Sequence, residues 1–200
     1  MDALTLLTQR KSNKKLTAPA PSQVQLEQMF QAALHAPDHG KLEPYHFVVI
    51  QGTGLSKLES LLKAAVAEFE LGEERLKKAE NFARRAPMVI AVIAKINHEV
   101  KKVPGWEQML TAGAATYAIQ LAGNALGFES FWATGPLVEG RELRETFGCD
   151  KNDKIVALLQ IGTAAEKLER DCKPKDLSRF VSHLYDQKRR RFPPFLLFLF

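Results

Sequence analysis

The chain has 200 residues, of which 46% are apolar and 26% are charged, and this composition is typical of one compact globular domain with a sizeable core. Its net charge is +5 at neutral pH, but Lys188, Arg189, Arg190 and Arg191 carry four of these charges, so the rest of the chain carries only +1. Because nucleic-acid-binding domains normally concentrate basic residues on a folded face, this distribution argues against that class of protein.

Three further features of the sequence predict a cytoplasmic protein. Only Cys149 and Cys172 are present, which is too few for a disulfide framework and fits a reducing compartment. The N-terminal stretch "MDALTLLTQRKS" has an early acidic residue and lacks the long apolar core of a secretory signal. No run of residues approaches the roughly 20 apolar positions that a membrane-spanning helix needs.

The N-terminal part of the chain predicts two helices joined by a loop. Asp2 can cap a short helix that contains several leucines. Residues 13–22, "NKKLTAPAPS", contain two prolines and predict a loop. Ser22 and Gln25 have the spacing of a capping box at the start of the second helix, and Pro37 predicts its end.

The middle of the chain predicts two strands with two helices between them. The apolar run "HFVVIQ" at 46–51 predicts a buried strand, and "GTG" at 52–54 predicts a turn. Apolar residues at helical spacing follow over 55–69, and the charged stretch 73–85 predicts a more solvated helix. The run "MVIAVIAKI" at 88–96 is rich in β-branched residues and predicts a second strand.

The segment 104–127 predicts a long helix whose middle is crowded with small residues, including all four at 112–115. Gly127 is a natural stop for this helix. Because small side chains let another backbone or a flat ligand approach closely, we expect the helix to be central and buried.

The last third of the chain predicts a strand at 128–134, a short helix at 140–148 and a strand at 154–163. None of the connections carries the glycine fingerprint of a dinucleotide-binding Rossmann unit. We therefore predict an α+β fold with helices around a four-stranded sheet. A single domain is expected over residues 1–185, followed by a basic and apolar extension over 186–200.

The extension ends in "KRRRFPPFLLFLF", whose apolar part is too short to span a bilayer. We interpret it as a loose or partner-packed tail. Adhesion to a membrane surface and contact with nucleic acid are the alternatives.

The common catalytic motifs are missing from this sequence. It contains no P-loop, no G-x-S-x-G, no H-E-x-x-H and no clustered cysteines. His35 and His39 are four residues apart, which suits a metal on a helix, but Pro37 breaks the helix between them. No metal site is predicted.

Three short polar clusters remain, each at the end of a regular element. Arg10, Lys11 and Ser12 offer the cations, hydroxyl and amides that hold a phosphate, or else form a solvated basic loop. The connection at 35–46 offers imidazoles and amides that can address a heterocycle, or else is a structural loop. The segment 132–134 puts an indole and a hydroxyl at a strand end, where a core tryptophan is the simpler interpretation.

In their order and spacing, four stretches resemble the nitroreductase family, and in particular its short YdjA-like branch of NAD(P)H nitroreductases. These are "MDALTLLTQRKS", "HAPDH" with "PYHFVVI", "GFESFWATGPL" and "FGCDKNDKIVALLQIGT", so the resemblance extends from about residue 1 to residue 165. It implies a mainly antiparallel sheet surrounded by helices, and a homodimer with FMN at the subunit interface.

The resemblance assigns two of the polar clusters to FMN. The family pattern R-[RK]-S maps to Arg10, Lys11 and Ser12, which would grip the flavin phosphate. The A-P-D-H loop maps to His35 and His39, which would reach the flavin from the partner subunit.

The resemblance also assigns the strand end and the segment before it. The family pattern W-R-S maps to Trp132, Ala133 and Thr134 as further FMN-binding residues. The sequence departs from the pattern at Ala133 and at His35, where the branch has arginine. The stretch that matches the nicotinamide nucleotide segment consists of Ala122, Gly123, Asn124, Ala125, Leu126 and Gly127.

The function that the resemblance implies is an FMN-dependent oxidoreductase. It would transfer hydride from NADH or NADPH, through bound FMN, to an electron-poor acceptor such as a nitroaromatic or a quinone. Because the flavin carries the chemistry, no catalytic side chain is predicted. The alternative is a flavin-binding protein with little or no turnover; neither nucleic acid nor membrane is predicted as a partner of the domain.

Overall fold

The computed structural model describes residues 2–166 and 176–184. The chain divides into two units, residues 1–169 and 170–200. In the second unit the described residues contain a short 3-10 helix, η2 (Leu177–Arg179), whose first turn is capped by Asp176. The predicted extension over 186–200 lies outside the described residues, and the single domain over 1–185 stays a prediction.

A five-stranded antiparallel sheet lies at the centre of the first unit. Its strands are β1 (Leu16–Thr17), β2 (Tyr45–Gln51), β3 (Met88–Ala94), β4 (Glu129–Ala133) and β5 (Lys154–Ala164). Strand β5 pairs with β3 along one edge and with β4 and β1 along the other, and β2 lies beyond β3. The four predicted strands are all present, and the two-residue β1 is an addition within the predicted loop.

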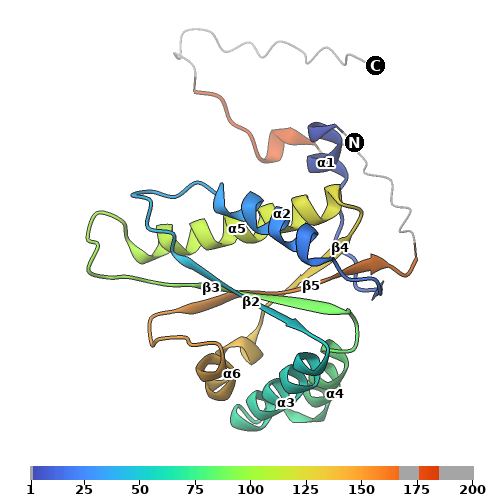
Figure 1. Ribbon diagram of the computed structural model, residues 1–200. Helices are drawn as coiled ribbons and strands as arrows, with labels where there is room; N and C mark the ends of the chain where they lie inside the picture. Colours follow the sequence, from blue (N-terminus) through green and yellow to red (C-terminus); the bar gives the residue numbers. More distant parts are fainter. Residues whose placement is uncertain (1, 167–175, 185–200) are drawn as a thin grey trace. The chain divides into compact units, whose positions relative to one another are not determined.

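Helices cover both faces of this sheet (Figure 1). Helices α2 (Gln23–Leu34) and α5 (Gly105–Ala125) cover one face. Helices α3 (Thr53–Glu68), α4 (Gly72–Phe82) and α6 (Arg141–Thr146) cover the other. With the short α1 (Ala3–Gln9), this arrangement confirms the predicted α+β class.

Strand β3 explains why the protein has two apolar cores. Successive side chains of a strand point to opposite faces of the sheet. Met88, Ile90 and Val92 accordingly pack in the core under α2 and α5. Their neighbours Val89 and Ala91 pack in the core under α3, α4 and α6. All seven residues of β3 are buried, which is why its sequence is a continuous apolar run.

The predicted helix starts are confirmed. The carboxylate of Asp2 accepts hydrogen bonds from the backbone N–H groups of Leu4 and Thr5 at 3.0 and 3.1 Å. The Ser22–Gln25 capping box is complete at the start of α2. Helix α2 ends at Leu34, before Pro37, as expected for residues that precede a proline.

Two expectations about burial are wrong in this chain. Strand β2 is an edge strand, and Val49 keeps 37% of its surface exposed. Helix α5 is buried along one side, whereas Trp106 and Leu110 on its other side are 60% and 62% exposed. An apolar run alone does not say how many of its sides the fold covers.

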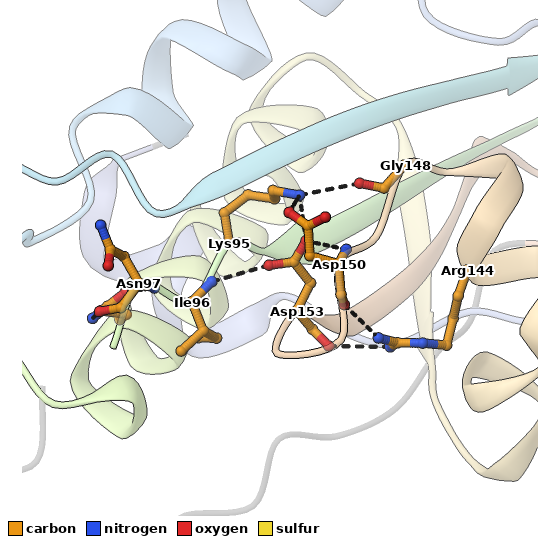
Figure 2. A network of polar contacts seen from close by, with 8 residues as sticks. Lys95, Ile96, Asn97, Arg144, Gly148, Asp150 and Asp153 are labelled. Atoms are coloured by element: carbon orange, nitrogen blue, oxygen red, sulfur yellow. Dashed lines mark hydrogen bonds and ion pairs between the residues drawn. The ribbon is translucent and has the colours of Figure 1, made fainter. Parts of the chain in front are cut away.

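A charged cluster ties the end of β3 to the start of β5 (Figure 2). The Asp153 carboxylate, 3% exposed, accepts hydrogen bonds from the Lys95 ammonium and from the backbone N–H groups of Ile96 and Asp150. The guanidinium of Arg144 donates to the backbone carbonyls of Asp150 and Asp153 at 2.8 and 3.1 Å. The cluster fixes the turn that leads into β5.

Candidate cofactor site

A cavity of about 470 Å³ opens where α5, β4 and the start of β5 meet. Between β4 and α6 lies the 3-10 helix η1 (Pro136–Glu139), which contributes to the same cavity. The lining is mostly apolar, with a few polar side chains, as is usual for a small-molecule site. It consists of Met109, Gly113, Trp132, Thr134, Gly135, Val138, Glu139, Lys154, Ile155 and Val156.

The predicted strand-end motif lies at this cavity. Trp132 is half-buried and lines it, and the indole Nε1–H donates a hydrogen bond to the carbonyl of Val156 at 2.9 Å. Thr134 is exposed and also lines the cavity. Ala133, between them, pairs with Leu158 at the last register position of β4 and β5. The hydrogen bond holds the indole in a fixed orientation beside the space that a ligand would enter.

The N-terminal cluster lies beside β4 and α5. Ser12 forms a bridge with Ser130 of β4, and the backbone N–H of Asn13 donates to the Ser130 carbonyl at 3.0 Å. The guanidinium of Arg10 lies 5.8 Å from the centre of the Tyr117 ring on α5. The structure therefore brings residues 10–12 next to the strand that carries the strand-end motif.

Arg10 has a buried donor that needs an acceptor. Among residues 2–166 and 176–184, its Nη1 is the buried side-chain polar atom without a hydrogen-bond partner. A buried charged donor in this state is costly, and an anionic ligand would remove the cost. The residues at this position therefore fit the phosphate of a flavin nucleotide.

The histidine loop lies elsewhere along α5. The Nδ1 atom of His39 is 2.7 Å from the Glu107 carboxylate, near the start of the helix. The Thr111 hydroxyl donates to the carbonyl of Pro37 at 3.0 Å. His35 is the exposed C-cap of α2. From Glu107 to Tyr117 the helix rises by about 15 Å, so one subunit does not bring His39 to Arg10.

The predicted nicotinamide segment forms the C-terminal turn of α5. The Phe128 N–H donates to the Gly123 carbonyl at 2.8 Å, and Gly127 has a φ of +90°. A side chain at Gly123 would meet Cε of Met29 at 3.1 Å, so this glycine allows α5 to pack closely on α2. These contacts account for the glycines structurally, and nucleotide binding by residues 122–127 stays a prediction.

The sequence did not reveal two charged residues in the lining of the cavity and a third beside them. Lys154 and Glu139 both line it, with Nζ of Lys154 3.5 Å from Oε2 of Glu139. Nη1 of Arg144 lies 3.7 Å from the same oxygen. For Lys154 the only signal in the sequence is the polar stretch "CDKNDK", which ends at this residue and has the composition of an ordinary surface turn.

In the part of the chain that the structure describes, no three His, Cys, Asp or Glu side chains gather around a position that could hold a metal ion. None of the helices described here has the length and apolar character needed to cross a bilayer.

Comparison with known proteins gives consistent results. The family model "Nitroreductase family" matches residues 7–163. A Haemophilus influenzae protein named "Putative NAD(P)H nitroreductase" is 62% identical over 184 residues, which is 92% of this chain and all of the relative. The Escherichia coli protein "Putative NAD(P)H nitroreductase YdjA" is 40% identical over 183 residues, with the same coverage.

Solved structures of low sequence identity share the fold. A nitroreductase-like family protein from Bacillus cereus superposes with a TM-score of 0.81 at 20% identity, covering 93% of this chain and 97% of its own. The FMN- and NADPH-dependent nitroreductase NfnB from a Sphingopyxis strain superposes with a TM-score of 0.73 at 16% identity, covering 92% and 99%.

Proposed function

Because the chain belongs to the nitroreductase family, we propose that it is an NAD(P)H-dependent flavin oxidoreductase acting on electron-poor acceptors such as nitroaromatics or quinones. The observation that carries the proposal is the unpartnered, buried Nη1 of Arg10 beside the strand that leads to the cavity. An anionic group would provide the acceptor that Arg10 lacks, and a flat ring on the same cofactor would fit the mostly apolar cavity.

In this proposal FMN is held along one side of β4. Arg10, Lys11 and Ser12 would hold its phosphate through charge-assisted hydrogen bonds. Trp132 and Thr134 would border the ring, together with the backbone at Ala133. When bound, FMN would supply the hydride chemistry, which explains why no acid–base pair or nucleophile stands out in the sequence.

The role of the chain's own residues is then binding, orientation and exclusion of water. The hydrogen bond from Trp132 to Val156 fixes the indole, which would border the ring of a bound cofactor. Met109, Val138 and Ile155 provide an apolar surface for a planar ligand. The acceptor and the nicotinamide would use the same open side of the cavity in turn.

We also propose a homodimer, with α5 at the interface. Trp106, Met109, Leu110 and Tyr117 recur at helical spacing and are 60%, 42%, 62% and 38% exposed. A contiguous exposed apolar stripe of this kind usually marks an interaction surface. The distance between His39 and Arg10 within one subunit supports the proposal that His39, and less directly His35, serve the site of the partner.

Residues 122–127 remain our proposal for the NAD(P)H contact. Within this segment Ala125 and Gly127 are exposed at the end of α5, while Gly123 is buried against α2. A bulky substitution at Ala125 should raise the KM for the nucleotide without changing FMN content.

The proposal is tested by purifying the protein and recording its visible spectrum before and after addition of FMN. A flavin spectrum that NADH or NADPH bleaches without oxygen, and that a nitroaromatic or quinone restores, would support it. A protein that stays colourless after FMN addition would refute it. Bound flavin that neither nucleotide bleaches would point instead to a flavin-binding protein without turnover.

A further inference from the structure

We infer that Lys154 places a positive charge at the ring of FMN and raises the reduction potential of the bound flavin. The inference rests on the function proposed above. Lys154 is the first residue of β5 and lines the same cavity as Trp132 and Thr134. Among the described residues that line the cavity, Lys154 is the one with a cationic side chain. The other lining residues are apolar or small, except for Thr134 and Glu139.

Strand β4 determines which end of the ligand Lys154 would meet. Ser12 bridges Ser130, and Trp132 follows on the same side of the strand because side chains alternate, while Thr134 comes directly after the last strand residue. From Ser130 to Ala133, its last residue, the strand advances by about 10 Å. A ligand with its phosphate at residues 10–12 would therefore extend along β4 and bring its ring to the end of the cavity that Lys154 lines.

The charge on Lys154 is available to such a ligand. Its Nζ is 3.5 Å from Glu139 Oε2, and the two side chains are 48% and 46% exposed. Exposed pairs of this kind contribute little stability, so the ammonium can turn from Glu139 to a ligand. Arg144, only 15% exposed, lies 3.7 Å from the same oxygen and already compensates the carboxylate. Glu139 is therefore shared by two cations, and Lys154 is the one of the two that lines the cavity.

A positive charge here acts differently on the two redox states of the ligand. Two-electron reduction increases the negative charge on the flavin ring, and charge placed near the ring is one of the means by which a protein tunes flavin electronics. A nearby ammonium therefore stabilises the reduced form more than the oxidised form. No covalent step by Lys154 is required.

The experiment measures the FMN content and the reduction potential of the flavin-loaded protein in three variants. Lys154→Met removes the charge while keeping the length of the side chain. We expect it to retain oxidised FMN but to lose about tenfold in its preference for reduced over oxidised flavin, which corresponds to a potential about 30 mV lower. Lys154→Arg keeps the charge and should keep the reduction potential of the parent. Glu139→Gln removes a negative charge and should raise the reduction potential above that of the parent.

Lys63→Met is the matched control. Lys63 forms a comparable exposed pair with Glu80, at 3.2 Å, on helices that cover the opposite face of the sheet. It should leave the potential unchanged. An unchanged potential in FMN-loaded Lys154→Met would overturn the inference about Lys154 and leave the proposed function standing. Loss of oxidised FMN from Lys154→Met would do the same. A parent protein that takes up no FMN would overturn the proposed function as well.

Discussion

Lys95, directly after β3, and Asp153, directly before β5, form an ion pair that joins the two strands at this end, with the carboxylate almost fully buried (Figure 2). Burial by itself raises the pKa of Asp153, but the hydrogen bonds from Lys95 and from the backbone N–H groups of Asp150 and Ile96 outweigh it, so that the pKa is lowered. The pair anchors the corner from which Lys154 projects toward the cavity.

Replacing Asp153 should destabilise the fold. Asp153→Asn leaves Lys95 without its main partner and weakens two backbone hydrogen bonds, and we expect a loss of about 3 kcal/mol in the free energy of unfolding. Urea denaturation measures it. The control is Asp150→Asn, because the Asp150 side chain is 84% exposed and its carboxylate is 3.4 Å from the same ammonium. A cost below about 1 kcal/mol is expected for the control.

The same pair predicts how stability depends on pH. Because the pKa of Asp153 is lower in the folded protein than its ordinary value of 3.8, its contribution is complete above 3.8 and is lost as the pH falls through the folded pKa. The parent should therefore lose more stability than Asp153→Asn does as the pH falls from about 4 toward 2. Urea midpoints for both proteins across this range measure the difference. Equal slopes would show that the carboxylate is not stabilised by folding.

Removing Arg10 should weaken FMN binding without lowering the stability of the flavin-free protein. Arg10→Met deletes a buried donor that has no partner in the described chain, so the protein without flavin should be at least as stable as the parent. Affinity for FMN should fall by about 10- to 100-fold, since a charge-assisted contact with the phosphate is lost. Fluorescence titration with FMN and thermal melting of the protein without flavin measure the two quantities.

Arg75→Met is the control for this variant, because Arg75 is exposed on α4, on the other face of the sheet. If both variants bind FMN as tightly as the parent, the phosphate lies elsewhere.

A charge on the exposed stripe of α5 should break the dimer. Leu110 is 62% exposed, and Leu110→Glu would place a carboxylate in the proposed interface without disturbing the core of the subunit. Sedimentation velocity should show monomers, and FMN should be lost with the dimer. Phe69→Glu, at the C-terminal end of α3, introduces the same charge at an exposed apolar residue outside the stripe and should leave the dimer intact.

Mixed dimers test whether His39 serves the partner's site. We expect both Arg10→Ala and His39→Ala to weaken FMN binding, the first more strongly. If the two residues act on one flavin from different subunits, a dimer of one Arg10→Ala chain and one His39→Ala chain has one intact site and one doubly defective site. Half of the parental FMN stoichiometry should then return at high affinity. Two weak sites would show that both residues act within one subunit.

Much of the fold could be predicted because its signals are local. The capping groups of Asp2 and Ser22 lie within three residues of the N–H groups that they satisfy. The apolar run of β3 is continuous because both of its faces are covered. By contrast, β1 has two residues and gains its hydrogen bonds from Ala164 and Thr163, far away in the sequence. No local pattern predicts such a strand.

The candidate site was only partly predictable for the same reason. Arg10, Trp132 and Thr134 belong to short stretches that the family resemblance singles out, and the structure places them along one strand and its neighbours. Lys154 begins β5 and Glu139 ends η1, which follows β4, and the two residues meet at one cavity because β4 and β5 are adjacent in the sheet. The pairing of β4 with β5 depends on the topology of the sheet, and the local sequence around Glu139 or Lys154 does not predict it.

The two tryptophans of the chain lie at the proposed dimer interface and at the candidate cofactor site. Trp106 is 60% exposed on the stripe of α5, and Trp132 stands beside the cavity. The protein thus carries two intrinsic optical reporters: assembly should shift the emission of the first indole to shorter wavelength, and an incoming chromophore should quench the second. Single replacements by phenylalanine would assign each signal, so that the order of the two events could be timed in unlabelled protein.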